Sequence, residues 1–131
     1  MKIDLATQSF AFKDLTQPIV AEWYAEPSAS GEPMYEAPIH RHHECDEAWY
    51  VLEGSLGFLI NDETVIAQQG ELMYVEKGQS HTFWNASNAR TRYLIFMTPK
   101  TQSLIDAIHS AEDRSPTALK ALFNQFDAEL L

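Results

Sequence analysis

The chain has 131 residues, 45% of them hydrophobic and 21% charged, a composition typical of one globular domain with enough apolar residues for a core. Nine lysines and arginines stand against nineteen aspartates and glutamates, and the net charge of −10 disfavours binding to nucleic acid or to anionic membrane surfaces. Because Cys45 is the single cysteine and no stretch has the apolar length of a signal peptide or a membrane span, we expect a cytoplasmic protein without an internal disulfide.

Most of the chain consists of short segments rich in aromatic and β-branched residues, separated by turns that contain glycine, asparagine or aspartate. The expected strands are residues 19–24, 48–52, 56–60, 64–67, 72–75, 81–85 and 92–97. No helical period interrupts them, so the pattern predicts an antiparallel, all-β body.

The pattern changes at Pro99, after which apolar residues such as Leu104, Ile105 and Ile108 recur at helical spacing. Ser115 followed by Pro116 is typical of a helix start. We therefore predict that residues 101–131 form one or two amphipathic helices, a helical extension of the same domain as the β-barrel of residues 1–100. The expected role is a cap over apolar sheet surface, with a mobile lid or a dimer contact as alternatives.

A cluster of ionisable residues is the clearest functional signal. His40 and His42 are two residues apart, so on a strand their side chains leave the same face. Glu47 has the wrong parity for that strand, but a turn after His42 would bring it in from a neighbouring strand, and His81 needs only to lie nearby. Three imidazoles and one carboxylate suit one divalent ion of Fe, Mn, Ni, Co, Cu or Zn. Four protein ligands leave positions open for a substrate on a metal that prefers six.

The spacing of these residues resembles the two motifs of the cupin family. The first motif is similar to His40-x-His42-x4-Glu47-x6-Gly54, and the second to Gly70-x7-Gly78-x2-His81-x3-Asn85. The resemblance implies a double-stranded β-helix, or jelly-roll barrel, and a homodimer. It also implies that His40, His42, Glu47 and His81 are the metal ligands.

Strand alternation also predicts a substrate pocket, because residues two and four positions beyond an inward-facing ligand share its face. The predicted lining residues are Trp49, Phe58, Phe83, Asn85 and Phe96. Such a pocket is largely apolar and aromatic around a polar metal end, which is typical of a small-molecule site.

Other polar residues receive a structural interpretation. His43 is expected to face solvent or to support the ligands from outside, and His109 to lie on the surface. Cys45 is interpreted as a small buried residue or an incidental thiol, with a reactive thiol as the alternative. Arg90 and Arg92 are expected to form edge ion pairs, with binding of a substrate carboxylate as the alternative.

These features favour a mononuclear metal enzyme that acts on a small organic substrate, dioxygenase-like and therefore an oxidoreductase, in which Glu47 also accepts a proton. One alternative is a metal-dependent isomerase, epimerase or lyase acting on a sugar acid or a related molecule. Another is a cupin that binds a small molecule without converting it. The ligand pattern itself does not distinguish the metal, the substrate or the reaction.

Overall fold

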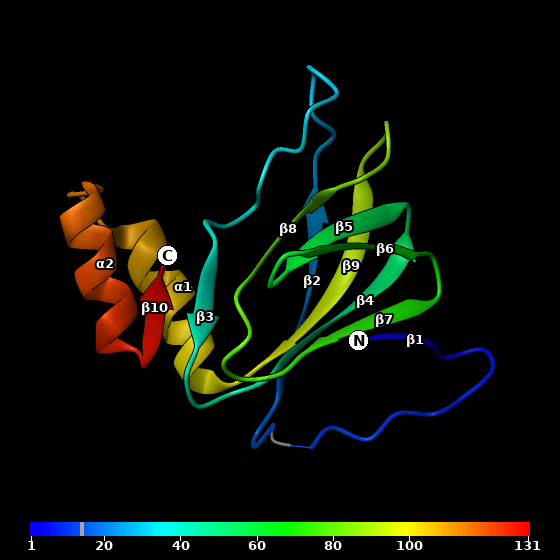
Figure 1. Ribbon diagram of the computed structural model, residues 1–131, viewed down its shortest axis with the longest axis horizontal. Coiled ribbons are helices and arrows are strands. Elements are labelled where there is room, and N and C mark those ends of the chain that lie inside the picture. The colour runs from blue at the N-terminus through cyan, green and yellow to red at the C-terminus, as the bar shows by residue number, and fades with distance from the viewer. Residues whose placement is uncertain (14) are drawn as a thin grey trace.

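In a computed structural model, which describes residues 1–13 and 15–131, the strands form two antiparallel sheets and the helices follow them at one side (Figure 1). The first sheet has the order β1 (Lys2–Asp4), β7 (Glu71–Val75), β4 (Glu47–Glu53), β9 (Thr91–Met97) and β2 (Ile19–Ala25). The second has the order β10 (Ala128–Leu130), β3 (His40–His42), β8 (His81–Asn85), β5 (Ser55–Ile60) and β6 (Glu63–Gln68). The helices are α1 (Pro99–Ser110) and α2 (Pro116–Gln125). The predicted all-β double-stranded β-helix with C-terminal helices is confirmed.

All seven strands expected from the hydrophobic pattern are present, with ends shifted by one residue at most. Strands β1 and β10 were missed because three residues are too few to show an alternation. Strand β1 pairs with β7, and β10 pairs with β3.

The core lies between the two sheets and follows from alternation along the strands. On β9, the buried residues Tyr93, Ile95 and Met97 point into this core, and Trp49 and Val51 of β4 meet them from the next strand. Trp49 and Phe58 are the largest completely buried side chains of this core, so aromatic rings form much of its inner surface.

The C-terminal segment packs against the barrel through β10 and through Ile105 of α1. Helix α1 starts at Thr98, whose side chain accepts a hydrogen bond from the Thr101 amide, and α2 starts at the expected Ser115 cap with Pro116 after it. The two helices and β10 share a small apolar cluster around Leu104 and Phe123. In Figure 1, α1, α2 and β10 stand together beside β3. Neither helix found in the described part of the chain has the length and apolar character needed to cross a membrane.

The turn between β4 and β5 depends on Gly54, which has a positive φ of 91°. A Cβ atom at this position would lie 2.3 Å from Thr91 Oγ1 and 3.1 Å from Thr91 Cα. Thr91 cannot easily move away, because hydrogen bonds hold its hydroxyl in place. The hydroxyl accepts a bond from the Ser55 amide at 3.2 Å and donates one to Asn85 Oδ1 at 3.0 Å. The close approach and the backbone angle both require glycine here.

We expect Gly54→Ala to lower the free energy of unfolding by about 3 kcal/mol, of which roughly half is backbone strain and half is overlap with Thr91. Gly70 is the matched control, because its φ is 85° but a Cβ there would meet nothing within 4 Å. Gly70→Ala should therefore cost only the strain, about 1.5 kcal/mol. Urea unfolding of both variants measures the difference, and equal losses would contradict the proposed overlap.

Candidate metal centre and cavity

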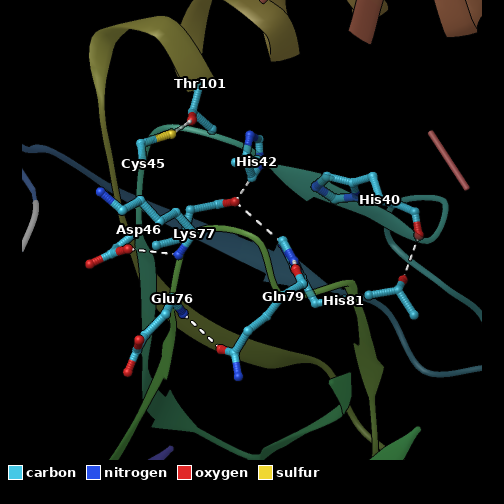
Figure 2. Close-up of polar contacts among 12 residues, drawn as sticks. His40, His42, Cys45, Asp46, Glu76, Lys77, Gln79, His81 and Thr101 are labelled. Carbon is cyan, nitrogen blue, oxygen red and sulfur yellow. Dashed lines mark hydrogen bonds and ion pairs between the residues drawn. The ribbon is translucent and has the colours of Figure 1, made fainter. Parts of the chain in front are cut away.

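Four buried side chains meet between the two sheets at the end of the barrel next to α1 and α2. His40 and His42 come from β3, and His81 comes from the adjacent β8, where it is directly paired with His40 (Figure 2). Glu47 reaches them from β4 in the opposite sheet. One ligand atom from each of the four residues lies within 4.8 Å of the others, and all four residues are buried. The arrangement brings together the four residues that the sequence analysis grouped.

The connection from β3 to β4 crosses from one sheet to the other, and several hydrogen bonds fix its path. The His42 carbonyl accepts a bond from the Gly78 amide at 2.7 Å, which ties the end of β3 to the turn before β8. Asp46 accepts a bond from the Lys77 amide at 2.7 Å and another from the Tyr74 hydroxyl. Glu47 follows directly, so the connection sets where its carboxylate enters the barrel.

Backbone carbonyls fix the proton positions of two of the imidazole rings. His40 Nδ1 lies 2.7 Å from the Pro38 carbonyl, and His81 Nδ1 lies 3.1 Å from the Gln79 carbonyl. Because a carbonyl only accepts, both Nδ1 atoms carry the proton, which leaves Nε2 as the metal-binding atom of these rings.

The donor set fits a metal ion. His42 Nε2, His81 Nε2 and Glu47 Oε1 are buried, and among the described residues their ion-pair contacts are with one another. Two imidazole nitrogens and a carboxylate oxygen that share one buried site without further partners favour an ion that all three can bind. Three imidazole nitrogens and a carboxylate oxygen suit a divalent transition metal, and the site could hold one.

Without a metal, the charges of the cluster compensate one another. Glu47 Oε1 lies 2.6 Å from His42 Nε2 and 3.3 Å from His81 Nε2. Burial alone would lower the pKa of His42, but the Glu47 carboxylate outweighs it and raises the pKa to about 10. Burial alone would raise the pKa of Glu47, but His42 and His81 hold it well below its usual range. Burial, together with the neighbouring histidines, lowers the pKa of His40 to about 3.

We expect metal uptake at pH 7 to release about one proton, because the metal-free chain protonates His42 and a metal ligand must be neutral. Metal affinity should therefore rise about tenfold per pH unit above pH 7 and level off near the His42 pKa of about 10. In the metal-free chain, the stability contributed by protonated His42 is complete below its unfolded pKa of about 6.5 and is lost as the pH rises through about 10. Calorimetry in buffers of different ionisation enthalpy measures the released proton, and a heat independent of the buffer would contradict this expectation.

A cavity of about 540 Å³ opens beside the cluster. Its inner end contains His40, His42 and Glu47, and its barrel wall includes Trp49 and Phe83. Most of the remaining lining is aliphatic or aromatic. A volume of this size holds a drug-sized molecule, and its make-up suits one that is apolar over most of its length.

Three of the predicted lining residues lie elsewhere. Phe58 faces inward but is covered by Trp49 and Phe83, with ring centroids at 5.2 and 5.9 Å, and is completely buried. Asn85 donates to the carbonyls of Ala25 and Ala89 and holds the end of β8, so its role is structural.

Phe96 lies on the opposite face of the first sheet from the cavity. It packs in a separate apolar cluster, where Phe12 of the N-terminal segment meets its ring at 5.4 Å. The prediction that it lines the pocket is therefore wrong. The physical reason is parity, because Phe96 is adjacent to the inward-facing Ile95.

The outer half of the cavity was not predicted from the sequence. Tyr93 of β9 contributes to its wall, and so do residues of the C-terminal segment. These further lining residues are Thr101, Leu104, Ile105, Ile108, His109, Arg114 and Phe123. The helical spacing of the apolar residues showed that the segment packs against something, but contained no signal for which surface it covers.

The remaining polar residues mostly follow their structural interpretation. His43 is exposed, and Arg90 and Arg92 pair with Glu26 and Glu22 on the sheet surface. Cys45 Sγ is half-buried and lies 3.3 Å from Thr101 Oγ1.

Comparisons with known proteins agree with this arrangement. Residues 30–97 match the cupin domain family. A curated relative, the tetracenomycin polyketide synthase protein TcmJ of Streptomyces glaucescens, is 34% identical over 71 residues, which is 54% of this chain and 46% of the relative. The chain thus spans about half the length of the curated relative it matches.

Two solved structures are similar in fold. A sugar phosphate isomerase of the cupin superfamily from Silicibacter pomeroyi is 25% identical, with a TM-score of 0.52, over 63% of this chain and 50% of that one. A cupin-2 domain protein from Shewanella frigidimarina is 17% identical, with a TM-score of 0.51, over 72% of this chain and 87% of that one. The second likeness shows the fold alone.

Proposed function

The chain belongs to the cupin domain family, and from that premise we propose that it is an enzyme dependent on one divalent transition metal ion, acting on a small, flat, oxygen-bearing organic molecule. The observation that carries the proposal is the position of the four-residue cluster at the inner end of a mostly apolar cavity. Such a cavity suits a substrate whose oxygens meet the metal and whose rings lie against the aromatic wall. Similarity to a polyketide synthase protein favours a polyketide-like substrate, rich in ketone oxygens.

In this proposal each residue of the cluster has a defined task. His40, His42 and His81 hold the ion, and Glu47 supplies the fourth ligand. A bound metal ion would act as a Lewis acid with open positions for substrate oxygens. Glu47 also accepts the proton of a substrate hydroxyl, as its carboxylate is the one acidic ligand group of the cluster. The aromatic wall around Trp49 excludes water from the reacting end.

We propose oxidation of the substrate by dioxygen as the reaction class, because a dry, aromatic cavity suits an electron-rich ring and protects it from water. A second candidate is redox-neutral isomerisation, which the likeness to the Silicibacter pomeroyi sugar phosphate isomerase favours. A hydroxylated substrate of this second candidate would use the polar residues of the outer cavity, among them Glu36, His109 and Arg114.

The test loads the protein with iron(II) and offers it a diketone, a flavonol and a catechol. An oxygen electrode measures uptake, and mass spectrometry measures the product. A product that gains two oxygen atoms supports the oxygenase, and a product of unchanged mass supports the isomerase. Metal-dependent binding with no conversion would contradict both reactions and leave a binding protein. The metal-free chain and the Glu47→Gln variant are the controls, and neither should consume oxygen.

We also propose that the protein acts as a cytoplasmic homodimer. Strand β2 is an edge of the first sheet, and its outer face leaves Val20 52% exposed and Tyr24 51% exposed. Apolar side chains on a sheet edge favour pairing with a second copy. Light scattering during size-exclusion chromatography should give twice the mass of one chain, and Val20→Lys should shift that mass towards one chain.

A further inference from the structure

Trp49 carries a hydrogen-bond donor that no residue in the described part of the chain accepts. Its side chain is 1% exposed, and its indole Nε1 has no hydrogen-bond partner among the described residues. The residue lines the cavity, and its ring centroid lies 5.8 Å from that of His81. The unused N–H group therefore belongs to a residue next to the metal ligands.

Tyr93 carries a second donor of the same kind. It is 2% exposed and lines the cavity, and its hydroxyl forms no hydrogen bond with any residue the structure describes. Its ring centroid lies 5.6 Å from that of Phe83, which in turn lies 5.4 Å from that of Trp49.

The register of the strands sets the spacing of the two donors. Trp49 is paired with Ile95 across β4 and β9, so Tyr93 lies two residues further along β9, on the same face. Two residues of strand span about 7 Å. Trp49, Phe83 and Tyr93 thus form one aromatic wall that leads away from the metal ligands.

A buried donor without a partner is unfavourable, and phenylalanine in place of Trp49 would keep an aromatic ring without that penalty. Two unused donors on one wall of a cavity therefore point to a partner that enters from outside. We infer that Trp49 Nε1 and the Tyr93 hydroxyl donate hydrogen bonds to two oxygen atoms of the substrate, which rests on the proposed function of the same cavity. Burial, with Glu36 as a smaller cause, raises the pKa of Tyr93 above its usual value, so its phenol remains a donor at all working pH values.

The two donors narrow the substrate class. The molecule must reach from the metal ligands past Trp49 to Tyr93, lie flat against the rings, and carry oxygen acceptors beyond those that bind the metal. A fused system of two or more rings with carbonyl or phenol oxygens along its edges meets these requirements, and the cavity of about 540 Å³ has room for it. A single catechol ring or a short diketone occupies only the metal end.

The test measures binding to zinc-loaded protein, because zinc is redox-inert and the probe is not consumed. Alizarin offers a chelating pair of phenol oxygens and carbonyl oxygens on the next ring, whereas 2,3-dihydroxynaphthalene offers only the chelating pair. Trp49→Phe and Tyr93→Phe should each weaken alizarin binding about 5–10-fold and change binding of 2,3-dihydroxynaphthalene by less than about twofold. Metal content should be unchanged in both variants, since neither residue is a ligand.

Trp84→Phe and Tyr50→Phe are the matched controls, because they remove the same donor groups from residues that do not line the cavity. Neither should alter alizarin binding. Unchanged alizarin binding in Trp49→Phe and Tyr93→Phe, or equal weakening in the controls, would overturn the inference, and zinc-dependent binding of both probes would then still support the proposed function. If neither probe binds zinc-loaded wild-type protein, the inference and the proposed substrate class both fail.

Discussion

Replacing His42 by alanine will weaken metal binding by about 100-fold or more, whereas replacing His43, the next residue, will leave it within about twofold. His42 is 4% exposed and contributes one ligand atom to the cluster, while the His43 side chain is exposed. Losing one of four ligands also leaves the Glu47 carboxylate buried with one imidazole contact fewer. The loss of the ligand and the poorly compensated charge act in the same direction.

Elemental mass spectrometry of the two variants, after purification without chelators, measures this difference. The His43→Ala protein should retain the wild-type metal content, and the His42→Ala protein should retain almost none. Circular dichroism shows whether His42→Ala still folds, and His81→Ala provides a second ligand variant in case it does not. Full metal content in folded ligand variants would contradict the four-residue site.

Replacing Phe123 by alanine will lower the free energy of unfolding by about 3–5 kcal/mol and the melting temperature by roughly 10 °C. Phe123 is 2% exposed, anchors the cluster shared by α1, α2 and β10, and packs against His40 with ring centroids 5.4 Å apart. The variant thus removes the ring contact between α2 and His40, on the strand that carries two metal ligands. Phe123→Leu keeps most of the volume and should lose less than half as much.

The same experiment tests whether the segment folds with the barrel. Helix content from circular dichroism and the fluorescence of barrel tryptophans such as Trp49 should change in one coincident transition in wild type. If Phe123→Ala melts the helices while the tryptophan signal is unchanged, the segment is a separate unit and the expectation of a single domain is wrong.

The metal cluster was predicted from the sequence because its residues fall at regular spacings. His40 and His42 satisfy strand alternation, and a turn after His42 can bring in Glu47. The same alternation gave the correct inward face for Trp49 and Phe83. These predictions rest on local geometry, whereas the addition of His81 rested on the resemblance to the second cupin motif, because residues so far apart in the chain meet only in the fold.

The sequence could not show on which face of the sheet Phe96 lies, because residues 93–96 read Tyr-Leu-Ile-Phe and are apolar at every position. Without a polar residue in between, alternation cannot say which of them point inward. The N-terminal segment with Phe12 makes the outer face of β9 suitable for Phe96, and that contact joins distant parts of the chain. Tyr93 and Phe123 were missed as lining residues for a related reason, since their place depends on tertiary packing.

The pairing of β10 with β3 determines when β3 is covered during synthesis of the chain. Strand β3 is synthesised early, yet its outer edge is covered only by residues 128–130, and the Leu131 amide also bonds to the Ile39 carbonyl. A chain emerging from the ribosome therefore exposes the strand of His40 and His42 as an open edge until residues 128–130 have been made. All four residues of the metal cluster are thus synthesised before the strand that closes the edge beside them.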